Sequence, residues 1–215
     1  KVSECCRLSF KLEQSDLDDA KQPWRMRYCA LQNVTLNLPR LAYQSDGHDT
    51  KLFAKIQEVF GKAVQAHLEK RRFLEHLMAL GDSGPLALLT MNRDGAPYLR
   101  MHRVTNLIGM VGLNEMVQIH KGQQHHETDD AIRFGLKVIA YMKLLCDKMS
   151  QKHNMRFVLE QTPAESTAYR FAKLDLREFS PRSGHVVKGD ISRGEIYYSN
   201  STYLNVGNVM NPIDR

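Results

Sequence analysis

The chain has 215 residues, 42% of them hydrophobic, and carries a formal net charge of +6 with an isoelectric point near 9.1. These values are typical of a soluble globular protein with one large domain or two small ones. No apolar run approaches the roughly 18 residues of a membrane span, and the start, KVSECCRLSF, lacks the layout of a signal peptide, so the sequence predicts neither membrane insertion nor export.

The positive charge favours anionic partners such as nucleotides or nucleic acid. The basic run at 70–72 lies on a predicted helix without interleaved aromatic residues, which favours a solvated helix face over a nucleic-acid groove. The cysteines show neither a disulfide framework nor metal-ligand spacing, so we expect no metal site here and a reducing compartment, the cytoplasm. They are Cys5, Cys6, Cys29 and Cys146.

The first part of the chain predicts a loop, a strand and a helix in that order. Residues 7–27 are polar, with a group of aspartates, and predict an irregular segment. The stretch VTLNL at 34–38 alternates as a strand does, and Pro39 ends it. From Lys51 to Gly81 the apolar residues recur at helical spacing, which predicts a long amphipathic helix.

The middle of the chain predicts a hairpin and then a strand that runs into a helix. LALLT at 86–90 follows a Gly-Pro break and predicts a strand, which the turn at 93–95 would pair with 97–101. The apolar run 107–113 predicts another strand, and 116–120 a short helix.

A polar segment at 121–130 predicts a solvated loop, because the histidines in and beside it fit no metal-ligand template. These histidines are His120, His125 and His126. Thr128 is expected to cap the next helix, whose apolar face extends to Met149 and places Cys146 in the core.

The stretch Arg156–Asp175 predicts a buried strand that leads into a capped helix. Thr162 fits the N-cap, Pro163 the first helical position, and Glu165 stands three residues after the cap, as in a capping box. Two interpretations of Glu165 follow. Its carboxylate could bond back to the Thr162 amide, or the helix N-terminus could bind an anion on the amides of Ala164, Glu165 and Ser166.

The order of these elements predicts an α/β architecture with parallel strands and helices outside, followed by a tail of strand and loop at 188–215. In such folds the functional groups lie just beyond the carboxyl ends of strands. Three ends carry polar or charged residues and are the candidate site: 37–39, 112–115 and 160–165.

Five segments, in this order and spacing, resemble the catalytic subunit of the anaerobic, class III ribonucleoside-triphosphate reductases. They are CCRL at 5–8, NVTLNLPRLAY at 33–43, VGLNEMVQIHKG at 111–122, FVLEQTPAESTAYRFAKLD at 157–175 and YYSNSTYLNV at 197–206. The resemblance implies part of a ten-stranded α/β barrel of the glycyl-radical enzyme type, with a finger-loop region at 1–27 and strands and helices of the second half-barrel at 28–215. The glycyl radical and the zinc site of that family belong to a region with motifs that this sequence lacks. We therefore expect a fragment that is inactive alone.

The resemblance also implies roles for individual residues. The family's Cys-Arg pattern matches Cys6 and Arg7, which makes Cys6 the favoured carrier of the thiyl radical, with Cys5 as the alternative. The pocket for the substrate would be lined by Thr162, Ala164 and Ser166, and Glu165 would face the radical cysteine and bind a polar group of the substrate or reductant.

The implied activity is anaerobic radical reduction of ribonucleoside triphosphates to deoxyribonucleoside triphosphates. The implied partners are those substrates, a radical-SAM activating enzyme, a second copy of the full-length chain, and formate or a small redox protein as reductant. Formate-using members carry an asparagine where this chain has 28–32, YCALQ, which weakens the case for formate. Two other functions remain open: another glycyl-radical enzyme such as an acyl-transfer lyase, and a nonenzymatic nucleotide- or nucleic-acid-binding domain.

Overall fold

The structure is a computed structural model that describes residues 2–5, 8–10, 14–92, 95–205, 207 and 211. Its chain divides into two compact units, the first made of Lys1–Val34, Lys62–Ile108 and Cys146–Glu160, the second of Thr35–Gly61, Gly109–Leu145 and Gln161–Arg215. None of the helices in the described ranges has both the length and the apolar character needed to cross a membrane.

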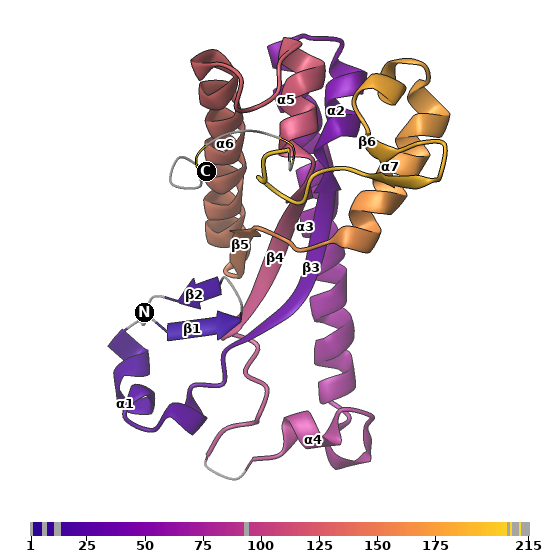
Figure 1. Cartoon of the computed structure of the whole chain (residues 1–215). Helices are drawn as coiled ribbons and strands as arrows, with labels where there is room; N and C mark the ends of the chain where they lie inside the picture. The colour runs from indigo at the N-terminus through magenta and orange to yellow at the C-terminus, as the bar shows by residue number, and fades with distance from the viewer. Residues whose placement is uncertain are drawn as a thin grey trace. The chain divides into compact units, whose positions relative to one another are not determined.

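Each of the strands β3, β4 and β5 is followed by a helix in the described chain (Figure 1). The strands are β1 (Val2–Cys5), β2 (Leu8–Phe10), β3 (Cys29–Asn37), β4 (Val104–Val111), β5 (Arg156–Glu160), β6 (Lys188–Asp190) and β7 (Glu195–Tyr197). The α-helices are α1 (Leu17–Ala20), α2 (Leu38–Ser45), α3 (Asp49–Met78), α4 (Ala87–Thr90), α5 (Leu113–Lys121), α6 (Asp129–His153) and α7 (Glu165–Phe179). Short 3₁₀ turns cover Gln14–Asp16, Pro23–Arg25, Gly81–Ser83 and Arg182–His185.

A parallel sheet in the order β3-β4-β5 confirms the predicted α/β class. Its central strand β4 is buried at every residue, as expected of a parallel strand covered on both faces. The predicted strands at 34–38 and 107–113 correspond to β3 and β4, although β3 begins earlier and β4 ends earlier. Two antiparallel pairs, β1-β2 and β6-β7, lie outside this sheet.

The sequence analysis missed α2, which begins directly where β3 ends. The Asn37 side chain caps it by accepting a hydrogen bond from the Arg40 amide at 3.3 Å, and Pro39 lies in its first turn. Helix α2 packs against α5, beside it in Figure 1. The Asn-Leu-Pro sequence is therefore a helix start as well as a strand stop.

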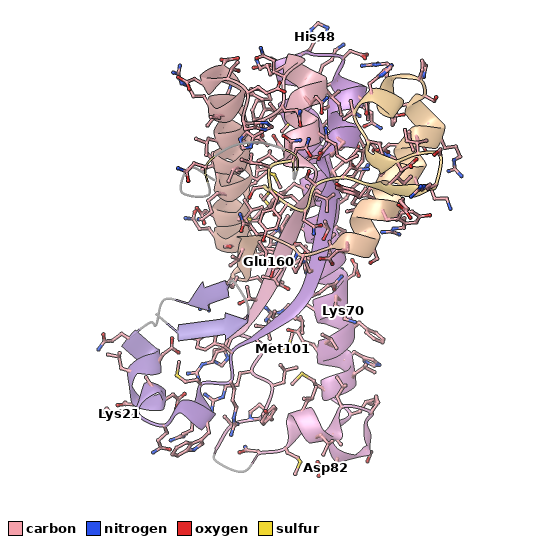
Figure 2. The ribbon with its side chains drawn as sticks, in the orientation of Figure 1. Lys21, His48, Lys70, Asp82, Met101 and Glu160 are labelled. Atoms are coloured by element: carbon pink, nitrogen blue, oxygen red, sulfur yellow. The ribbon has the colours of Figure 1, made fainter. Side chains whose placement is uncertain are left out.

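The two long helices have the predicted faces and cap. The basic run on α3 is solvated: Arg71 and Arg72 pair with Glu75 and Glu69, and Figure 2 marks the exposed Lys70 beside them. Helix α6 is capped by Thr128, whose hydroxyl oxygen accepts from the Ala131 amide at 3.3 Å. Cys146 is fully buried, as predicted.

The predicted strand at 86–90 is wrong. Residues 87–90 form the single-turn helix α4, because the amide of Ala87 bonds to the Gly84 carbonyl and that of Thr90 to the Leu86 carbonyl. Leucine and alanine favour a helical turn over a strand. The predicted chain reversal is present as an antiparallel bridge between Asn92 and Pro97, while 93–94 lie outside the described residues.

The predicted loop at 121–130 is present, but its solvation is wrong for His125, and His120 beside it is also buried. His120 is buried in α5, where its Nε2 lies 2.8 Å from Asp49 Oδ1 and its ring stacks on Phe134 at 4.8 Å. His125 is buried too, packed where a Cβ on Gly135 would stand. Both rings fill space between helices, which loop polarity did not indicate.

A buried ionic cluster holds part of the predicted irregular segment. Arg103 lies 3.1 Å from Asp16 and 2.7 Å from Asp19, and its Nη1 donates to the carbonyls of Arg25 and Met26. Hydrogen bonds from Arg103 and Arg100 hold the pKa of Asp19 below its ordinary value. The segment around α1 is thus anchored by charge within the first unit.

Arg103→Met should lower the free energy of unfolding of the first unit by about 3–5 kcal/mol, since it removes a buried guanidinium that pairs with both Asp16 and Asp19. Arg72→Met is the matched control, because its pair with Glu69 is exposed and should contribute at most about 1 kcal/mol. Urea unfolding of the full-length protein measures both. Equal losses for the two variants would show that the cluster does not anchor this segment.

Gly112 links β4 to α5 with a left-handed φ of 77°. A Cβ there would also lie 2.5 Å from Pro39 Cγ. Gly112→Ala should therefore lower the free energy of unfolding by about 2–5 kcal/mol, through backbone strain and overpacking. Gly61→Ala is the control, because Gly61 lies within α3 and a Cβ there would meet open space. Alanine at this position should raise the free energy of unfolding by about 0.5–1 kcal/mol. Thermal unfolding that ranked the two variants in the opposite order would contradict this account.

Candidate active site

The second unit contains a cavity of about 750 Å³ beside the start of α7. Its walls come from α7, from β7 and from the chain that follows β7. The lining residues are Gln161, Glu165, Ala168, Tyr169, Ile196, Tyr197, Tyr198, Ser199, Asn200, Thr202, Tyr203 and Leu204. The cavity therefore joins the predicted strand end at 160–165 to the tail segment that the sequence analysis left without a role.

Glu165 lies on this cavity, but the predicted capping box is absent. Helix α7 begins at Glu165 with Ala164 as N-cap, and no side chain of the cap residue bonds back to the helix. The cap comes from Asn200, whose Oδ1 accepts from the Ala164 amide and whose Nδ2 donates to Glu165 Oε1, each at 3.4 Å. Because the helix starts two residues later than predicted, Thr162 is not the N-cap.

The residues predicted around Glu165 have different surroundings. Thr162 is buried, the Ala164 amide is taken by Asn200, and Ser166 borders a separate hollow along the outer face of α7. Among the lining residues, Gln161 donates a hydrogen bond to the hydroxyl of Thr202. Of Thr162, Ala164, Glu165 and Ser166, only Glu165 is among the residues that line the cavity.

The wall at Tyr198 is fixed by a buried carboxylate. Tyr198 donates to Asp175 at 3.1 Å, and Asp175 also accepts from Asn37 at 3.0 Å and from Arg40 Nε at 2.7 Å. Burial raises the pKa of Asp175, while the hydrogen bonds from Asn37 and Arg40 oppose that shift. Burial also raises the pKa of Tyr198, so the phenol keeps its proton and acts as the donor.

Sequence reasoning missed Asn200, Tyr198 and Asp175. Asp175 could have been found, since Ala168, Ala172 and Asp175 recur on one buried face of α7 and an acidic residue there requires partners. For Tyr198 and Asn200 the sequence carries no local signal, because their partners are more than twenty residues away.

The two candidate radical cysteines belong to the first unit. The backbone of Cys5 ends β1, opposite Leu8 of β2, and Cys6 lies outside the described residues. Within the described part of the chain, no group of three or more His, Cys, Asp and Glu side chains is placed to hold a metal ion.

Comparison with known proteins matches residues 1–215 to the family described as anaerobic ribonucleoside-triphosphate reductase. Similar curated proteins with that description come from Salmonella typhimurium (27% identical over 189 residues, covering 85% of this chain and 26% of that protein) and Escherichia coli (26% identical, with the same coverage). The protein of enterobacteria phage T4 is 23% identical over 192 residues, covering 85% of this chain and 29% of its own.

Solved structures support the fold. The anaerobic ribonucleotide reductase from Thermotoga maritima with MES in the active site superposes with a TM-score of 0.68 at 20% identity, covering 84% of this chain and 28% of that one. The same enzyme in complex with dATP and CTP gives 0.63 at 21% identity, covering 73% and 26%. This chain spans about a quarter of the length of the curated relatives it matches. Because the family match extends over every residue, the chain belongs to the anaerobic ribonucleoside-triphosphate reductase family.

Proposed function

We propose that this chain forms part of the catalytic barrel of an enzyme that reduces ribonucleoside triphosphates to deoxyribonucleoside triphosphates by a radical mechanism without oxygen. The observation that carries the proposal is the 750 Å³ cavity with Glu165 on its wall, lined in part by the segment that follows strand β5 in sequence, in a member of this family. Strand ends of this kind are where α/β folds bind their ligands.

The proposed chemistry begins with a thiyl radical on Cys6, or on Cys5 as the alternative. The thiyl takes the 3′ hydrogen atom of the ribose, and the 2′ hydroxyl then leaves as water after accepting a proton. Formate or a small redox protein supplies the two electrons, and the thiol returns the hydrogen atom to C3′. A glycyl radical supplied by another part of the full-length protein would generate the thiyl.

Glu165 is proposed to bind a polar group of the substrate, since its carboxylate lies on the cavity and is held by one bond from Asn200. Thr162, Ala164 and Ser166 are proposed to shape the pocket around it. The full-length protein is proposed to act as a homodimer, in the cytoplasm, after activation by a radical-SAM enzyme. In the basic run on α3, Arg71 and Arg72 are paired with glutamates, which disfavours nucleic-acid binding there.

The test uses the full-length protein, activated under strict anaerobiosis and supplied with each ribonucleoside triphosphate and with formate or a reduced redox protein. Formation of the matching deoxyribonucleoside triphosphate, measured by chromatography, is the expected result. Activated enzyme that carries a glycyl radical but forms no deoxynucleotide with any substrate and reductant would refute the proposal.

A further inference from the structure

The strip Ser199–Ser201, of which Ser199 and Asn200 line the cavity, is bound to the junction of β4 and α5. The Gly112 amide donates to the Ser199 carbonyl at 2.8 Å, and the Leu113 amide donates to the Ser201 carbonyl at 3.1 Å. Between them, Val111 and Asn200 form an antiparallel bridge. The strip is therefore held along its backbone by the start of α5.

Glu115, in the first turn of α5, completes this attachment from a fully buried position. Its Oε2 accepts from the Ser199 amide at 3.0 Å, and its Oε1 accepts from the Ser199 hydroxyl at 2.9 Å and from Asn114 Nδ2 at 3.1 Å. Burial raises the pKa of Glu115, and the hydrogen bonds from Asn114 and Ser199 oppose that shift. Burying a carboxyl group costs desolvation free energy, even when several donors bond to it, and an apolar residue at this position would avoid that cost. Stability alone therefore does not account for a glutamate at position 115.

The next residue along the strip connects this attachment to the candidate site. Asn200 follows Ser199 directly, and its side chain meets both the Ala164 amide and the Glu165 carboxylate. Because both contacts are 3.4 Å long, a small movement of the strip would break them. The direction of the Glu165 side chain thus depends on where Glu115 holds Ser199.

We propose that Glu115 is a positioning residue that sets the location of Asn200 and, through it, the orientation of Glu165 on the cavity wall. This role rests on the proposed function of the cavity for its effect on turnover. Its structural part, the link from Glu115 to the start of α7, stands independently of the reaction.

Two substitutions in the full-length protein test the role. Glu115→Leu keeps most of the side-chain volume but leaves the Ser199 amide without an acceptor, whereas Glu115→Gln keeps an oxygen for that amide. We expect Glu115→Leu to lower kcat on the order of 10²-fold, and Glu115→Gln to stay within about tenfold of the parent. Hydrogen exchange of the Ala164 amide should be about tenfold faster in the leucine variant than in the glutamine variant.

Val138→Ala is the control, because Val138 is an apolar residue that is fully buried in α6 of the same unit. It should lower the thermal midpoint while leaving kcat and Ala164 exchange unchanged. If Val138→Ala reproduced the loss of activity and protection, or if Glu115→Leu changed neither, the positioning role would be overturned. Should the leucine variant fail to fold, Ser199→Ala decides: faster exchange at Ala164 supports the role, and unchanged exchange overturns it.

Failure of the positioning role and failure of the proposed function give different experimental results. A parent enzyme that forms no deoxynucleotide would refute the proposed function, yet exchange at Ala164 would still decide the link between Glu115 and α7. Unchanged exchange in an active parent and its variants would remove the positioning role and leave the proposed function intact.

Discussion

Cys6→Ser in the full-length protein should abolish deoxynucleotide formation while the protein remains folded. The O–H bond of serine is far stronger than the S–H bond of cysteine, so a serine cannot exchange a hydrogen atom with the radical that initiates the reaction. Activity is measured as deoxynucleotide formed per activated enzyme under strict anaerobiosis, and folding as the thermal midpoint. The expected result is loss of all turnover without a change in the midpoint.

Cys5→Ser is the matched control, since the substitution is the same and the position is adjacent. It should retain turnover. A fully active Cys6→Ser protein together with an inactive Cys5→Ser protein would assign the radical to Cys5. Full activity in both variants would remove this segment from the radical chemistry.

Glu165→Gln should lower kcat on the order of 10²-fold or more without changing stability. The structure disfavours the competing explanation for Glu165, because α7 begins at Glu165 with Ala164 as N-cap, so Glu165 does not stand three residues after the cap as a capping box requires. Glutamine keeps an oxygen for the bond from Asn200 but loses the charge that faces the cavity. Turnover and thermal unfolding of the same full-length preparation measure the two effects.

Glu178→Gln supplies the control on the same helix. Glu178 is exposed, pairs with Arg40 and is not among the residues that line the cavity, so its neutralisation should leave kcat unchanged. If Glu165→Gln were fully active, or if Glu178→Gln lost as much activity, the carboxylate of Glu165 would have no specific part in the reaction.

Periodicity in the sequence predicted the strands and the long helices, because a buried face repeats along each element, and the order of these elements predicted the parallel sheet. It failed at 86–90, where a short run of leucines is compatible with a strand or a helical turn. The predicted cap of α6 was correct because Thr128 bonds to an amide only three residues further along the chain. The cap of α7 was wrong because its acceptor, Asn200, is 36 residues away.

In the candidate site, too, local features were predicted from the sequence and long-range contacts were not. Glu165 was placed at a strand end by local pattern and lies on the cavity. The residues that hold the opposite wall, Glu115 and Asp175, act through contacts 84 and 23 residues away in sequence. A single sequence contains the residue types for such contacts, but not their pairing, since pairing is decided by the packing of the folded unit.

Because Asn200 caps α7 from a distant position in the sequence, this cap forms late during synthesis of the chain. Asn200 leaves the ribosome after Glu165, separated from it by 35 residues. At ordinary rates of elongation that gap lasts about 2 to 7 seconds, during which α7 exists with an open first turn. The pocket wall is therefore one of the last parts of this segment to assemble, and a nascent chain stalled between α7 and β7 would present an uncapped helix and no pocket.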